Sequence, residues 1–177
     1  MTRTYIISCK QHIDRVWRKC HAKLAAIRRA GNYLPSRVRK LLYQTFVLPH
    51  LDYCSAVWHS CGVTLSQKIE RVQNYAMRLI LRKPHRTSSE PLRRLLQLQT
   101  LSHRRANNVL SQVCRCLSNK APAYLSGKFV RNNTLPRYNA TRGAAELHLR
   151  RPKTEFYKRS FEYMGAKLYN ELPENRL

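Results

Sequence analysis

Acidic side chains are scarce in this sequence, which has 9 Asp and Glu residues against 34 Lys and Arg residues. The only aspartates are Asp14 and Asp52, so the chain contains no adjacent pair of aspartates. Metal-assisted phosphoryl transfer needs clustered carboxylates that hold Mg²⁺. We therefore expect no nuclease or polymerase activity, and neither a metal ion nor another cofactor.

Other shortages exclude further classes of protein. No run of 18 apolar residues is present, so a transmembrane helix is not expected, and no basic helix has an unbroken apolar face for a membrane surface. The N-terminal residues lack the hydrophobic core of a secretory signal, although their Arg content weakly resembles a mitochondrial presequence. The 6 cysteines are irregularly spaced, which indicates reduced thiols in an intracellular protein, nuclear or cytoplasmic.

The apolar residues are numerous enough, and regularly enough spaced, to predict a folded helical protein. They make up 43% of the 177 residues, and only 5 glycines interrupt long stretches with a period of 3.6. We expect an all-α fold, an irregular basic helical bundle with a loop-rich C-terminal extension. The expected division is a helical domain over residues 1–118 and a basic, loop-rich segment with a short C-terminal helix over 119–177.

The most apolar stretch, Leu41–Trp58, is expected to lie at the centre of the bundle. Pro49 cannot donate a backbone N–H, which predicts two short helical pieces that meet at Leu48–Pro49. We expect the first piece to begin near Pro35 and to bury Val38, Leu41, Leu42 and Phe46. The second piece is expected to run over residues 50–58.

The remaining helices are predicted from their apolar stripes and their end signals. One stripe includes Ile13, Cys20 and Ile27, and Gly31 marks its end. A second stripe includes Ile69, Val72 and Ala76. Ser88 or Ser89 is expected to cap a later short helix. The expected ranges are 10–30, 65–83, a short helix after residue 88, a helix that opens within 98–105 and runs to about 118, and a short helix that includes 156–168.

The predicted helix over 65–83 carries a stripe of a single charge sign. Lys68, Arg71, Tyr75, Arg78 and Arg82 share one face because their spacings of three and four follow the helical turn. A solvated helix face usually mixes charge signs, whereas a row of cations with an interleaved aromatic ring suits a phosphate backbone. We therefore predict nucleic-acid contacts there and at further basic positions, namely Lys83, Arg86, Arg104, Arg105, Arg150, Arg151 and Lys153.

Two further features leave alternatives open. His50, Cys54, His59 and Cys61 include donors that Zn²⁺ accepts, but their spacing matches no standard zinc motif, and buried structural thiols are the favoured interpretation. Residues 119–153 are rich in Pro, Gly and Arg. This segment either becomes ordered on a polyanion or remains a solvated tail.

Several motifs of the chain resemble, in the expected order, the region that follows the palm in reverse transcriptases of non-LTR (LINE-type, Jockey- or CR1-like) retrotransposons. LYQTFVLPHLDYCSAVW is similar to the family pattern LYxxxVxPxLxYxxxxW, and the C-terminal motif carries Tyr169 where the family usually has Trp. The motifs are HIDRVWRKCHAKL (12–24), LYQTFVLPHLDYCSAVW (42–58), IERVQNYAMRLI (69–80), LLQLQTLSHRR (95–105), PAYL (122–125) and RSFEYMGAKLYNELP (159–173).

This resemblance implies a thumb and C-terminal region without the fingers, the palm or its Asp-Asp motif. In the family that region grips the template–primer duplex and the element RNA, so the implied partner is RNA or an RNA–DNA hybrid, bound electrostatically. The reverse transcriptase palm and fingers, bound in trans, are a further implied partner. Two alternatives remain, a protein-interaction or structural remnant of a retroelement and a relic reading frame without a selected function.

Overall fold

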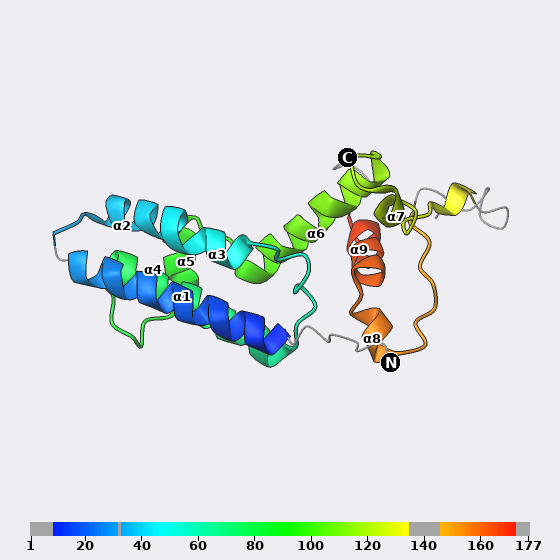
Figure 1. Cartoon of the computed structure of the whole chain (residues 1–177). Coiled ribbons are helices and arrows are strands. Elements are labelled where there is room, and N and C mark those ends of the chain that lie inside the picture. Colours follow the sequence, from blue (N-terminus) through cyan, green and yellow to red (C-terminus); the bar gives the residue numbers. More distant parts are fainter. Residues whose placement is uncertain (1–8, 32, 135–145, 173–177) are drawn as a thin grey trace. The chain divides into compact units, whose positions relative to one another are not determined.

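The computed structural model describes residues 9–31, 33–134 and 146–172 (Figure 1). Over these residues the fold is all-α, as predicted, and contains no strand. An isolated antiparallel bridge joins Arg131 to Leu147. Within the same ranges, none of the helices has the length and apolar character needed to cross a membrane.

The chain forms two compact units. The first consists of residues up to Cys54 together with Cys61–Arg104, and the second of Ser55–Ser60 with the residues from Arg105 onward. This division differs from the expected one at residue 118, because the helix α6 (Leu101–Leu117) continues through it and its later residues pack in the second core. In this division, residues 105–118 belong to the second unit rather than to the N-terminal helices.

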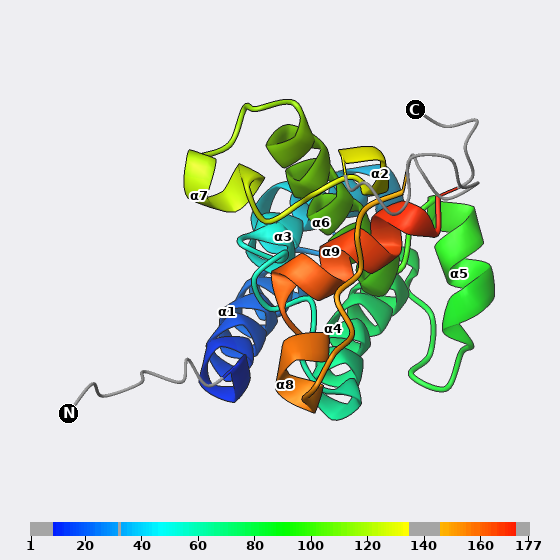
Figure 2. The same cartoon turned by 90° about the vertical axis from the view of Figure 1, so that its right-hand side faces the viewer.

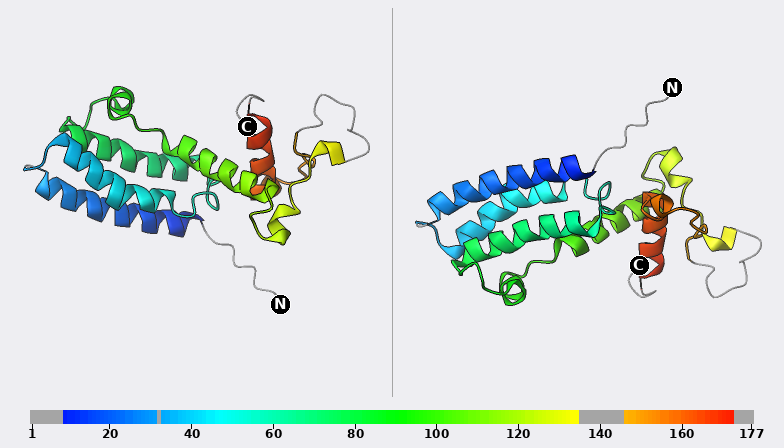
Figure 3. Two further views of the ribbon diagram at one scale, coloured as in Figure 1. Left: turned by 90° about the horizontal axis from the view of Figure 1, so that it is seen from above. Right: turned by 90° about the horizontal axis from the view of Figure 1, so that it is seen from below.

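The first unit is built from helices that run alongside one another (Figures 1 and 3). Its elements are α1 (Cys9–Ala30), α2 (Ser36–Leu42), the π-helical turn η1 (Tyr43–Val47), α3 (Leu48–Asp52), α4 (Val63–Leu81) and α5 (Ser89–Leu96). The stripes on α1 and α4 face each other, with Ile13 and Ile69 both fully buried. Ser88 occupies the N-cap position of α5, but its side chain makes no capping hydrogen bond. Helical periodicity thus located α1, α4 and α5 to within a few residues.

The buried face of α2 and η1 differs from the predicted one. Leu41 and Phe46 are 56% and 51% exposed, whereas Tyr43 and Val47 are fully buried and Arg39 is only 6% exposed. Residues 39, 43 and 47 are spaced by four, so the helix is rotated by about 100°, one residue, from the expected face. The amide of Leu48 donates to the carbonyl of Tyr43, which makes this turn wider than an α-helical one.

The break at Pro49 is present, but the helix after it is shorter than predicted. Pro49 lies in the first turn of α3, and this helix ends at Asp52 rather than at residue 58. Cys54 adopts a left-handed backbone with φ of 49°, which stops helical propagation. Tyr53 and Val57 are therefore 70% and 73% exposed, whereas Trp58 is buried.

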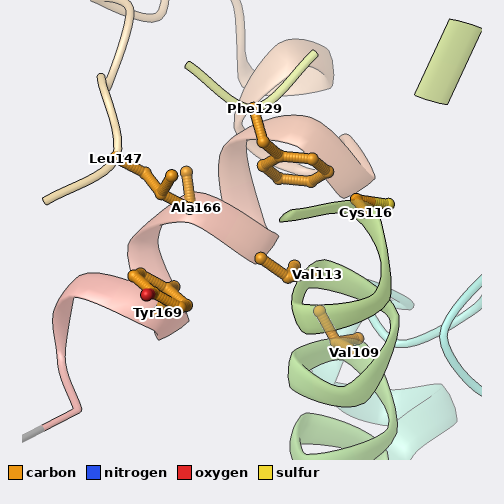
Figure 4. Packing of buried hydrophobic residues seen from close by; sticks show 7 residues of the cluster. All are labelled: Val109, Val113, Cys116, Phe129, Leu147, Ala166 and Tyr169. Carbon is orange, nitrogen blue, oxygen red and sulfur yellow. The ribbon is translucent and has the colours of Figure 1, made fainter. Parts of the chain in front are cut away.

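The second unit gathers its core where α6 meets α9 (Phe161–Asn170) (Figure 4). Residues 147–154 run antiparallel to α9, from its C-terminal end back to α8 (Glu155–Lys158) (Figures 1 and 2). Phe156, at the start of the helix predicted to include 156–168, lies in α8 and is 84% exposed. The short elements α7 (Ala123–Ser126) and η2 (Asn132–Thr134) connect α6 to this segment. The buried core residues are Val109, Val113, Cys116, Phe129, Leu147, Ala166 and Tyr169.

Candidate nucleic-acid interface

The α4 stripe begins with a cation that the protein itself neutralises. Lys68 Nζ lies 2.7 Å from a carboxylate oxygen of Asp14 on α1. The same ammonium lies 5.2 Å from the centroid of the Trp17 ring. The ion pair lowers the pKa of Asp14, chiefly through the hydrogen bond from Lys68. Lys68 therefore joins α1 to α4, a contact that sequence reasoning did not predict.

The next two stripe positions are more accessible. Arg71 is exposed, and Tyr75 is partly buried beside α1. The ring of Tyr75 stacks on His21, with centroids 5.8 Å apart and an interplanar angle of 19°. Burial lowers the pKa of His21, so this imidazole is neutral at pH 7. His21 and Tyr75 also line a shallow hollow together with Ala25, Arg28 and Arg29.

The last stripe positions, Arg78 and Arg82, donate hydrogen bonds to backbone carbonyls of neighbouring segments. Arg78 Nε donates to the carbonyl oxygen of Thr87 at 2.9 Å. Arg82 Nη2 donates to the carbonyl oxygen of Gly31 at 2.6 Å, and Arg82 itself adopts the left-handed conformation at the end of α4. A guanidinium carries five N–H donors, and a hydrogen bond to a neutral carbonyl does not itself cancel the guanidinium charge.

These arginines surround a cavity of about 430 Å³ within the first unit. Arg28 comes from the end of α1, Arg39 from α2, and Arg78 and Arg82 from α4. None of the nine described lining residues is acidic; they are Arg28, Gly31, Arg39, Tyr75, Arg78, Leu79, Arg82, Lys83 and His85. We call this cavity the arginine pocket.

Arg39 is the most unusual member of the arginine pocket, because it is buried without a carboxylate. It is 6% exposed, its Nη1 donates to the carbonyl oxygen of Leu79 at 3.0 Å, and its buried Nε has no hydrogen-bond partner. Burial, and to a lesser extent the charge of Arg82, lower the pKa of Arg39. Sequence reasoning missed Arg39 and Arg28; the spacing of Arg39 from Tyr43 and Val47 was the signal for its burial.

The remaining predicted contact residues fall into two groups. Lys83 and Arg86 are exposed beyond α4, and Arg150, Arg151 and Lys153 are exposed in the segment before α8. Arg104 and Arg105 instead face the protein. Arg104 Nη2 lies 2.5 Å from Asp52 Oδ2, and Arg105, 2% exposed, lies 5.2 Å from the centroid of the Trp58 ring. Because internal partners occupy these two residues, they are less available to a nucleic acid than the exposed cations are.

The structure also bears on the zinc hypothesis. Within the described ranges, no three His, Cys, Asp or Glu side chains gather closely enough to hold a metal ion. Cys54 is exposed, whereas burial and the nearby Arg105 lower the pKa of His59.

Comparisons of the chain with protein-family models, curated proteins and solved structures found no match.

Proposed function

We propose that this chain is a non-catalytic nucleic-acid-binding module, related to the thumb and post-palm region of a LINE-type reverse transcriptase. It grips RNA or an RNA–DNA hybrid electrostatically, in the nucleus or the cytoplasm. The observation that carries this proposal is the arginine pocket, where cations from α1, α2 and α4 converge with no acid in the described lining.

The distribution of acids supports the proposal. Seven of the eight acids in the described part of the chain form ion pairs with lysines or arginines, Asp14 with Lys68 and Asp52 with Arg104 among them. With 34 cations and only 9 acids, most of the positive charge remains uncompensated. A polyanion relieves the resulting self-repulsion and releases its own counterions when it binds.

Fluorescence anisotropy across a salt series tests the proposal. Single-stranded RNA, an RNA–DNA hybrid and duplex DNA are titrated with the full chain and with a triple variant, Arg71→Gln, Lys83→Gln and Arg86→Gln. These three cations are exposed on or just beyond α4. The matched control also removes three exposed cations, but ones of the second unit that are not predicted contacts: Arg115→Gln, Lys120→Gln and Arg159→Gln.

We expect tighter binding to RNA or the hybrid than to duplex DNA, and a larger loss for the α4 triple variant than for the control. Its log–log salt slope should fall by about 2, since each lost phosphate contact removes roughly 0.7 to 0.9. No binding to any of the three nucleic acids would overturn the proposed function. Equal losses in the two triple variants would assign the binding to diffuse charge and reject the α4 interface.

A second candidate function, protein interaction, has its own observation. A shallow cavity beside α1 is lined mainly by apolar residues, among them Phe46, which is 51% exposed. Reverse transcriptase palm and fingers in trans, or a second copy of the chain, are the partners this candidate implies. Light scattering distinguishes it, because a concentration-dependent dimer without nucleic acid favours interaction, and a monomer that binds RNA favours the first proposal.

A further inference from the structure

We infer that the arginine pocket is a discrete phosphate site, in which Arg39 is the buried ligand of one phosphate group and Tyr75 contacts the adjoining nucleotide. This inference rests on the proposed function and adds a defined anion site to a surface that otherwise acts through summed charge. Arg28, Arg78, Arg82 and Lys83 complete the lining.

The first argument is the state of Arg39. A buried guanidinium is normally paired, because burying a charge without a counterion is costly. Arg39 is only 6% exposed, yet its Nη1 donates to a neutral group, the carbonyl of Leu79. Its Nε has no partner, and its charge is further disfavoured by Arg82. An anion in the pocket supplies the compensation that the protein itself does not.

The second argument is the position of Gly31 at the rim. Its carbonyl accepts from Arg82, and a Cβ on Gly31 would lie 3.0 Å from the carbonyl oxygen of Ile27 and 3.6 Å from Cδ of Arg39. The close contacts of such a Cβ are with the carbonyl oxygens at the end of α1, whereas its distance to Arg39 is an ordinary van der Waals contact. The carbonyl of Gly31 holds Arg82 beside the end of α1, where Arg28 and Arg39 line the same pocket.

The third argument is the match between the pocket and a phosphate group. A terminal phosphate offers three oxygens and close to two negative charges to paired N–H donors of guanidinium forks, and an internal phosphodiester offers two oxygens and one charge. Four arginines and a lysine around about 430 Å³ provide enough donors for either group. Tyr75 lines both this pocket and the neighbouring hollow with His21, so a base next to the bound phosphate has aromatic rings to contact.

The phosphate has two possible sources, an end of the nucleic acid or an internal phosphodiester. The experiment therefore uses a single-stranded RNA with a 5′-phosphate and the same RNA with a 5′-hydroxyl. Binding of both is measured by fluorescence anisotropy at one fixed salt concentration. The variants are Arg39→Lys, which keeps a charge but loses the fork, and Arg28→Gln, which changes an exposed residue. The control is Arg37→Gln, an exposed arginine on α2 outside the pocket lining.

We expect Arg39→Lys and Arg28→Gln each to weaken RNA binding by about tenfold, as for loss of a charge-assisted hydrogen bond, and Arg37→Gln by less than about twofold. Circular dichroism establishes which variants are folded. If Arg39→Lys does not fold, the comparison of Arg28→Gln with Arg37→Gln decides. A preference for the 5′-phosphate that disappears in the pocket variants assigns the site to a terminal phosphate, and a loss that is equal for both RNAs assigns it to an internal one.

Two results would overturn the inference while leaving the proposed function intact. One is RNA binding by the unmodified chain with equal losses in the pocket variants and in Arg37→Gln. The other is a polyglutamate peptide that competes as well as the 5′-phosphorylated RNA at equal charge, since the pocket would then recognise carboxylates equally. No RNA binding at all by the unmodified chain would instead overturn the proposed function itself.

Discussion

Asn170 holds the main chain of Leu147 through both ends of its side-chain amide. Its Oδ1 accepts from the Leu147 amide and its Nδ2 donates to the Leu147 carbonyl, each at 2.9 Å. The neighbouring backbone groups are also paired. The backbone N–H of Asn132 donates to the carbonyl of Glu146, and the backbone N–H of His148 donates to the carbonyl of Val130, at 2.8 Å each. The backbone N–H and C=O groups around Leu147 thus have hydrogen-bond partners although they belong to no sheet. The side chain of Leu147 is buried in the core, with 1% exposure.

The first prediction concerns this amide. Asn170→Asp removes the donor and places a carboxylate beside the Leu147 carbonyl, which leaves a buried acceptor unsatisfied. We expect the free energy of unfolding in urea to fall by about 1 to 3 kcal/mol. The control is Asn107→Asp on the exposed side of α6, for which we expect little change. Equal stability of the two variants would show that the paired amide contributes nothing.

The second prediction concerns the contact of α9 with α6. A Cβ on Gly165 would lie 2.8 Å from Cγ2 of the buried Val113 and 3.3 Å from the ring of Phe129. Gly165→Ala should therefore lower the free energy of unfolding by about 1 to 3 kcal/mol through overpacking, and less in a Val113→Ala background that provides space. Gly127→Ala is the control, because its Cβ would meet nothing closer than 3.4 Å. Penalties that do not depend on Val113 would contradict this packing explanation.

The sequence predicted the long helices because their apolar residues recur at the helical period and their ends carry recognisable signals. It did not predict the rotation of α2, since the buried face includes the charged Arg39 and continues through a π-helical turn. A pattern of apolar residues marks neither a charged residue that becomes buried nor a turn whose helical pitch differs from that of an α-helix.

For the candidate site, periodicity alone placed Arg71, Tyr75 and Arg78 on one face of α4. It could not show which cations the protein neutralises, because the relevant acids are distant in sequence. Asp14 pairs with Lys68 across α1 and α4, and Asp52 pairs with Arg104 across α3 and α6. The arginine pocket likewise depends on three helices and was not predictable from any one of them.

The third prediction separates stability from binding at Arg104. Its guanidinium makes a two-pronged ion pair with Asp52, and this hydrogen bond is the main cause of the raised pKa of Arg104. The double variant Arg104→Gln with Asp52→Asn leaves the net charge unchanged. We expect it to lower the free energy of unfolding by about 1 kcal/mol, as for a partly exposed pair.

The RNA affinity of that double variant should stay within about twofold of the unmodified chain, because a neutralised pair adds little to the electrostatic attraction. Anisotropy and urea unfolding on the same preparations measure the two quantities. A large loss of affinity in a folded double variant would return Arg104 to the nucleic-acid interface.

The fourth prediction uses two of the six free cysteines. Cys20 is fully buried between α1 and its neighbours, and burial raises its pKa from 9.0 to about 11, whereas Cys54 is exposed. Because the thiolate is the reactive form, at pH 8 Cys20 has about a hundredfold less of it than a thiol with the unshifted pKa. Iodoacetamide followed by peptide mass spectrometry should modify Cys54 first, and both residues at similar rates in denaturant.

The same shift of the Cys20 pKa fixes the direction of a pH effect on stability. The unfolded chain loses the Cys20 proton near pH 9, while the folded chain keeps it until about pH 11. Between these values the folded state binds more protons, so the free energy of unfolding should decrease as the pH rises. Burial also raises the pKa of Tyr43, which adds to the decrease above pH 10. Cys20→Ala should therefore reduce the slope between pH 9 and 10 without abolishing it at higher pH, and an unchanged slope there would show that Cys20 is not the group responsible.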